Sequence, residues 1–205
     1  QAEDDIRYLV RSRGLGDVYK RQAQFLLGYP SSAVKDGAND APVEDLLAIL
    51  KATKPQVVYT HNLADKHNTH IGVTLKTIAA LRQLPQAERP QHVYGCEVWR
   101  DLDWMVDADK VAFDLSENES LQMALLGIFD SQISGGKRYD LATMGRRRAH
   151  ATYHESHATD VTTGMNFAMD LTPLIHDPDQ DVVAYVQAYI QRFADDVRQR
   201  IASAR

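Results

Sequence analysis

The chain has 205 residues, 44% of them hydrophobic, and a formal net charge of −5. This length suits one α/β domain with its own core and leaves little room for a second domain. The acidic balance argues against a nucleic-acid partner, which would require a basic face, and no apolar run reaches the ~18 residues of a membrane span.

The single cysteine, Cys96, excludes an intrachain disulfide and fits a reducing compartment, so we expect a cytoplasmic protein. Because Cys96 lies in an apolar segment that reads as a strand, we interpret it as a core residue rather than a nucleophile.

Residues 1–22 form an N-terminal segment that we exclude from the fold, leaving 23–205 as a single domain. Leu9 to Gln22 resembles a translated sequencing-adapter remnant of the kind found in metagenome-derived gene models. Gly14 and Gly16 would suit a phosphate loop, but a third glycine and a flanking strand are missing.

From residue 23 onward, short apolar segments alternate with segments of helical periodicity. The pattern predicts a strand-like segment at 23–29 and strands at 55–59, 93–99 and 110–115. It predicts helices at 43–51 and 71–81, a helix capped by residues 116–119, a helix carrying residues 146–150, and a last helix at 182–201 that packs on the domain. This alternation is typical of an α/β domain.

The polar turn between the strand at 55–59 and the next helix holds the main candidate residues. His61, Asp65, His67 and His70 follow the carboxyl end of a strand and enter a helix N-terminus, where open α/β sheets place their ligand sites. His67 and His70 can share a metal or a substrate because a spacing of three puts them on one helix face, and Asp65 can orient an imidazole. Helix capping is the alternative, but it explains aspartate and asparagine and not several histidines.

Charged residues after the later strands are further candidates. Arg100, together with Glu97, Asp101 and Trp104, either lines the substrate cleft or forms a salt-bridged surface corner. The basic residues Lys137, Arg138 and 146–148 indicate an anionic ligand such as a phosphate or carboxylate, although a solvated helix face also explains them.

Three further histidines, His150, His154 and His157, are spaced by four and three residues and would share one side of a helix. Such an arrangement can bind a metal or line the cleft.

One stretch resembles a known family. Thr60-His61-Asn62, then Asp65-x-His67-x-x-His70 and an apolar helix, resembles the second motif of the PIG-L (LmbE-like) family of zinc-dependent N-deacetylases. The segment 126–132, which ends in Ser-Gln, is similar to the helix that follows a later strand of that family. The resemblance implies a Rossmann-like, open, mostly parallel sheet with helices on both faces, here without its first strand–helix unit.

The resemblance also implies a function and roles for the residues. It implies a hydrolase of the amide C–N bond that removes the acetyl group from an N-acetylated sugar or sugar conjugate, such as an N-acetylglucosamine derivative. His70 would bind Zn²⁺, His67 would stabilise the oxyanion or protonate the leaving amine, and Asp65 would hold a histidine in its tautomer. We assign Arg138, Arg100 and His61 to substrate binding.

The family's first motif, His-x-Asp-Asp, completes its zinc site. Asp4-Asp5 matches the acidic pair, but Ala2 stands where the histidine would be, so a solvated acidic segment is the alternative. A non-catalytic α/β module that binds a small molecule or anion therefore stays open, as does a homo-oligomer. A metal-independent hydrolase is disfavoured because Ser31, Ser32 and Ser131 lack a nucleophile elbow.

Overall fold

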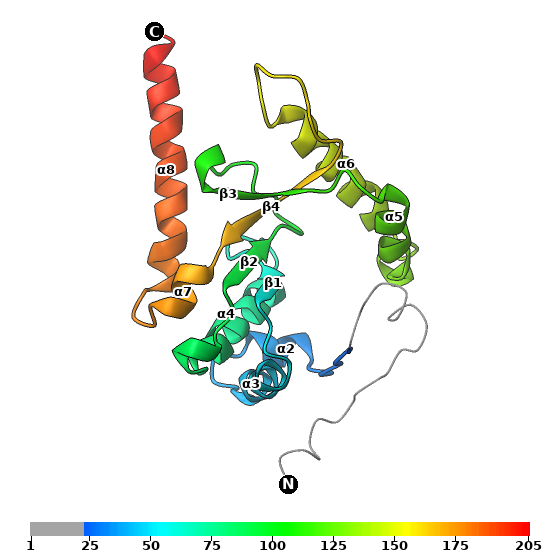
Figure 1. Cartoon of the computed structure of the whole chain (residues 1–205), viewed down its shortest axis with the longest axis vertical. Coiled ribbons are helices and arrows are strands. Elements are labelled where there is room, and N and C mark those ends of the chain that lie inside the picture. The colour runs from blue at the N-terminus through cyan, green and yellow to red at the C-terminus, as the bar shows by residue number, and fades with distance from the viewer. Residues whose placement is uncertain (1–22) are drawn as a thin grey trace.

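A computed structural model describes residues 23–205 as a mixed α/β structure (Figure 1). The adapter-like segment and the Asp4-Asp5 pair lie outside the described residues. None of the helices within 23–205 combines the length and the apolar character needed to cross a membrane.

Four strands form one open sheet in the order β1-β2-β4-β3. They are β1 (Val57–His61), β2 (His92–Cys96), β3 (Lys110–Asp114) and β4 (Met165–Asp170). β1 and β2 pair in parallel, whereas β4 lies between β2 and β3 and runs antiparallel to both. The prediction of a mostly parallel sheet is therefore wrong for the described residues, because apolar alternation reports which face a residue occupies and not the direction of its strand.

The helices fall into three groups along the chain. The first group is α2 (Ser31–Lys35), α3 (Ala41–Thr53) and α4 (Asn68–Arg82); the second is α5 (Glu119–Gly127) and α6 (Tyr139–Tyr153); the last is α7 (Thr172–His176) and α8 (Val182–Ser203). Short 3₁₀ turns occur at Gln86–Glu88, Asp107–Asp109 and Asp130–Gln132. In Figure 1, α2, α3 and α4 lie together at one end, while α6 runs beside β4.

Side-chain hydrogen bonds and one glycine fix α4 against its neighbours. The Thr74 hydroxyl donates to the carbonyl oxygen of His61 at 2.7 Å, which ties the first turns of α4 to the end of β1. A Cβ at Gly72 would lie 2.9 Å from the carbonyl oxygen of Val34, so only glycine permits this approach of α2 and α4. The start of α4, and with it the histidine-rich turn, is thereby held close to the sheet.

The core lies between the sheet and the helices α4, α7 and the first half of α8. Its fully buried members include Leu81 of α4, Met169 of β4 and Leu174 of α7. On the other side of the sheet, Tyr59 clusters with Tyr94 and Phe113 and is 62% exposed. The prediction of helices on both faces of the sheet is therefore confirmed only in part, because the described helices leave the Tyr59 ring on this second face uncovered.

Three local predictions are corrected by the structure. The strand-like segment at 23–29 is reduced to an isolated bridge at Phe25. Asn118, in the left-handed region at φ 57°, precedes α5 without a side-chain cap, because Ser116 instead donates to Asp114. α6 ends at Tyr153, before two of the three spaced histidines.

The last helix packs on the domain over only part of its length. Tyr189 is buried, and Tyr185 donates to the carbonyl oxygen of Asp170 at 2.6 Å. Farther along the apolar stripe, Ile190, Val197 and Ile201 are exposed. The prediction of a packed helix therefore holds around Tyr185 and Tyr189 and is wrong for the exposed residues of the stripe that follow them.

Candidate functional site

Three imidazoles gather where β1 ends and α4 begins. The rings of His61 and His70 stack with centroids 4.0 Å apart and planes 8° apart. His67 stacks on the other side of this pair, with its centroid 4.6 Å from that of His70. The sequence-predicted histidines are therefore brought together, with His70 between the other two.

Asp65 lies buried beneath this cluster and organises it. One carboxyl oxygen accepts from the backbone N–H of His67 at 2.9 Å, and the other accepts from the backbone N–H of Trp99 at 3.1 Å. That second oxygen lies 3.4 Å from Nδ1 of His70. Burial alone would raise the pKa of Asp65, but the two amide donors and His70 outweigh it and lower the pKa below its ordinary value. Asp65 is thus held as an ionised carboxylate that faces His70.

His67 is the N-cap of α4, and its environment fixes the position of its proton. Its Nδ1 accepts from the backbone N–H of Thr69 at 3.3 Å, which leaves the ring proton on Nε2. The residue is exposed, and its ring lies 5.9 Å from that of Trp99. His67 can therefore donate a hydrogen bond or a proton to a group that reaches it from solvent.

His61 is a neutral imidazole at pH 7. Burial is the largest cause, followed by the nearby His70, and together they lower its pKa from 6.5 to about 4. A neutral ring beside His70 can accept or donate a hydrogen bond without adding charge.

His70 fits one position of a zinc site. Its Nδ1 is buried, makes no hydrogen bond, and lies 3.4 Å from the Asp65 carboxylate. A carboxylate on one ring nitrogen orients the imidazole so that its other nitrogen, Nε2, can bind a metal. A catalytic zinc site needs three protein ligands, and within residues 23–205 no group of three or more histidine, cysteine or acidic side chains is placed to hold a metal. The described residues therefore supply one well-oriented donor rather than a complete site.

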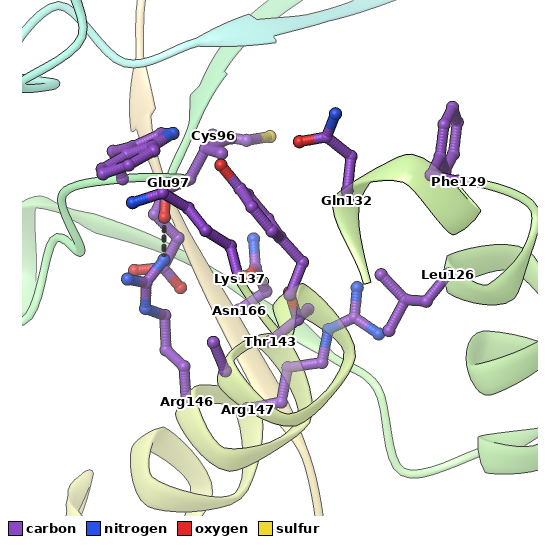
Figure 2. Close-up of a pocket in the computed structure, with 14 residues that line it drawn as sticks. Cys96, Glu97, Leu126, Phe129, Gln132, Lys137, Thr143, Arg146, Arg147 and Asn166 are labelled. Carbon is purple, nitrogen blue, oxygen red and sulfur yellow. Dashed lines mark hydrogen bonds between the residues drawn. The ribbon is translucent and has the colours of Figure 1, made fainter. Parts of the chain in front are cut away.

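A pocket of about 750 Å³ adjoins the histidine cluster across Trp99 (Figure 2). It opens between the end of β2, the segment after α5, and α6. Its lining combines cationic, aromatic and polar side chains, among them Lys137, Arg146, Arg147, Trp99, Tyr139, Gln132 and Asn166. In Figure 2, Arg146 and Arg147 both leave α6, and Gln132 lies across the pocket from them.

The predicted basic residues separate into two groups. Lys137, Arg146 and Arg147 line the pocket. Arg138 instead forms two hydrogen bonds with Asp140, at 3.0 and 2.7 Å, and its side chain is 59% exposed. Arg148 pairs with Glu119 away from this pocket.

Arg100 is exposed and does not line the pocket, although its carbonyl oxygen accepts from the Asn62 side chain at 3.4 Å. Trp104, a second candidate on the same loop, packs edge-on against Phe193 with centroids 6.3 Å apart. The surface-corner interpretation thus fits these two residues better than cleft lining.

Glu97 lines the pocket, as the cleft interpretation expected, but most of its carboxyl group is engaged in structure. Its oxygens accept from the backbone N–H groups of Leu102 and Phe167, each at 3.0 Å, and one oxygen lies 3.0 Å from Nε2 of His150. His150 is buried against Phe167, and His157 lies in the loop beyond α6. Within the described part of the chain, the histidines at 150, 154 and 157 therefore do not assemble into a metal-binding group.

Sequence reasoning missed Trp99 and Tyr139, and it treated Cys96 as a core residue. Trp99 connects the two parts of the site, because its backbone N–H donates to Asp65 and its ring contacts both His67 and Tyr139. Cys96 is half-buried and lines the pocket, and burial raises its pKa to about 11. The available signal for Cys96 and Trp99 was their position at the end of β2, where ligand sites form, whereas Tyr139 begins α6 and carried no such signal.

Comparisons with known proteins support the fold class. No protein-family model matches the chain. No curated protein matches it. Among solved structures, the chain is similar to the conserved protein TT1542 from Thermus thermophilus, with a TM-score of 0.51 and 18% sequence identity over 76% of this chain and 68% of that one. This likeness concerns the fold alone, a mixed α/β arrangement with an open sheet.

Proposed function

We propose that this protein is an N-deacetylase that hydrolyses the acetamide of an N-acetylated sugar or sugar conjugate and uses Zn²⁺ as its cofactor. The observation that carries the proposal is the stack of His61, His70 and His67 beside the buried Asp65, next to Trp99, whose ring also lines a pocket. The PIG-L-like motif in the sequence coincides with this stack.

His70 would hold the zinc ion through its free ring nitrogen while Asp65 keeps its ring oriented. When bound, zinc supplies a Lewis acid and lowers the pKa of a coordinated water. The resemblance assigns the remaining ligands to a His-x-Asp-Asp motif, for which Asp4-Asp5 is the partial match in this sequence and lies outside the described residues.

His67 would act on the substrate directly. Because its Nδ1 is occupied by the Thr69 amide, its Nε2–H is the available donor, and it can stabilise the developing oxyanion or protonate the leaving amine. The neutral His61 would bind a polar group of the sugar. Arg100 and Arg138, which the sequence also suggested for substrate binding, lie outside the pocket lining, and Arg138 is paired with Asp140.

A second candidate is a non-catalytic α/β module that binds a small molecule. One observation favours it: residues 23–205 provide a well-formed pocket lined by cationic and aromatic side chains, which can bind a ligand without a metal. In this alternative the protein binds the small molecule but does not hydrolyse it.

The test is acetate release from N-acetylglucosamine and its conjugates by the full-length protein and two variants. We expect His70→Ala to abolish hydrolysis, because its metal ligand is lost. We expect His67→Ala to keep the metal and to lower turnover by roughly 100-fold or more, the usual contribution of a positioned acid. His92→Ala, which replaces an exposed histidine on β2, is the matched control and should retain activity.

Full activity in His70→Ala would reject the deacetylase mechanism. Absence of acetate release from the wild-type protein with zinc bound, together with binding of a sugar, would favour the non-catalytic module.

A further inference from the structure

The described lining of the pocket beside Trp99 has more cationic than acidic side chains. Lys137, Arg146 and Arg147 line it, and within residues 23–205 none of the three forms an ion pair with a carboxylate. Glu97 is the acidic residue of this lining; its oxygens contact two backbone amides and His150, and its negative charge also acts on Arg147, so three cationic side chains face one carboxylate. The pocket is therefore suited to a negatively charged group.

Arg147 carries a hydrogen-bond donor that the described structure leaves unused. Its Nη1 donates to the Gln122 side chain at 2.7 Å, but its buried Nε has no acceptor. A buried donor without a partner costs free energy, so Arg147 would gain from an acceptor that a ligand brings close to its guanidinium group. Arg146 is partly committed, because one of its terminal nitrogens donates to the carbonyl oxygen of Val98 at 2.5 Å (Figure 2).

Two neighbouring arginines, unlike Arg146 and Arg147, form ion pairs with carboxylates. Arg138 and Arg148 lie within the same stretch and pair with Asp140 and Glu119, respectively. Among the described residues of this stretch, the arginines outside the pocket have acidic partners and those inside it have none, which distinguishes a binding site from a solvated helix face.

The rest of the pocket lining indicates which kind of uncharged group the ligand carries. Trp99, Tyr139, Leu126 and Phe129 provide an aromatic and apolar wall, and Lys137 lies 4.7 Å from the centroid of the Trp99 ring. A volume of about 750 Å³ lies within the usual range of small-molecule sites and exceeds the need of an inorganic ion.

We infer that this pocket binds an oxyanion-bearing small molecule of sugar size, with its phosphate or carboxylate contacted by Arg147, Arg146 and Lys137 and its ring against Trp99. The binding inference depends on the pocket alone. That this phosphate or carboxylate belongs to the substrate rests on the proposed deacetylase function. In that case the acetamide of the same substrate would extend past Trp99 toward His67.

The experiment is calorimetric titration of the full-length protein with glucose 6-phosphate, glucuronate and glucose, none of which carries an acetamide. We expect one of the two charged sugars to bind at least about tenfold more tightly than glucose, and its identity separates phosphate from carboxylate recognition. Arg147→Met should weaken that binding about tenfold or more, while Arg148→Met, on the same helix and paired outside this pocket, should leave it unchanged.

Lys137→Ala provides a second test, because this exposed loop residue can be replaced without disturbing the core. It should also weaken binding. Equal affinity for glucose and both charged sugars, or unchanged affinity in both the Arg147 and Lys137 variants, would overturn the inference. His70→Ala should retain the charged-sugar affinity, so failure of anion binding and failure of catalysis are separable results.

Discussion

The buried carboxyl group of Glu97 yields the most quantitative prediction about stability. Its side chain has no exposed surface, and it provides acceptors for the amides of Leu102 and Phe167 and a partner for Nε2 of His150, each at 3.0 Å. Glu97→Ala leaves three buried polar groups without partners at about 1–3 kcal/mol each, so the free energy of unfolding should fall by at least about 3 kcal/mol. That is a large part of the roughly 5–15 kcal/mol of a typical domain.

A graded series separates this mechanism from simple loss of volume. Glu97→Gln keeps the shape and one acceptor oxygen, so it should cost only about 1–3 kcal/mol, the penalty for one lost acceptor. Urea unfolding followed by circular dichroism gives both values, and Glu119→Ala, at an exposed ion pair, should stay within about 1 kcal/mol of wild type. A Glu97→Ala protein within that same margin would refute the reasoning.

Three further predictions concern other parts of the chain. Gly72→Ala should destabilise the protein despite the better helix propensity of alanine, because the new Cβ would lie 2.9 Å from the Val34 carbonyl oxygen. Gly145→Ala, with open space around its Cβ, should instead stabilise the protein by up to about 1 kcal/mol. Thermal unfolding that ranks the two variants the other way would contradict this. The Cys96 pKa of about 11 predicts alkylation by iodoacetamide at about pH 8 roughly 100-fold slower than in the urea-unfolded chain, and equal rates would count against its burial. Arg82→Ala should lower the unfolding free energy by about 2 kcal/mol and increase amide exchange in α7, since Arg82 donates to the carbonyl oxygens of Leu174 and Gln180 at 2.7 and 2.9 Å; unchanged exchange would argue against this link.

The Cys96 thiol also sets the sign of one pH effect. Its pKa is raised on folding from 9.0 to about 11, so the unfolded chain loses this proton first as the pH rises. The contribution of the neutral thiol to stability is therefore fully present below about pH 9 and is lost between pH 9 and 11. Cys96→Ala should remove this part of the alkaline loss of stability, as measured by urea unfolding at several pH values.

The junction from β1 to α4 was predictable from the sequence because its signals are local. An apolar run, Val57 to Tyr59, precedes a polar turn, and His67 and Thr69 follow at the helix start. The three imidazoles do come together, but His67 is the N-cap of α4 with an extended backbone, so it does not share a helix face with His70 as the spacing of three suggested.

The place of β4 in the sheet was not predictable in the same way. Met165 to Asp170 is a short apolar segment, and nothing in its residues states that it inserts between β2 and β3 and runs against both. Strand order and direction depend on how the connecting helices pack, which is a property of the whole domain.

The pocket was predictable only as a charge pattern. The sequence indicated an anionic ligand from five basic residues, but it could not show that Arg138 and Arg148 are neutralised by Asp140 and Glu119. The ion pairs of these side chains, and the position of Trp99 between the pocket and His67, emerge only when separate segments meet.

The central claim is that His70 holds a catalytic zinc ion, and metal analysis of the full-length protein tests it most directly. Mass spectrometry of the metal content should find about one zinc per chain in the wild-type protein and in His92→Ala, and almost none in His70→Ala. Equal zinc content in wild type and His70→Ala, with both proteins folded, would contradict the claim, because His70 would then not be the residue that holds the metal.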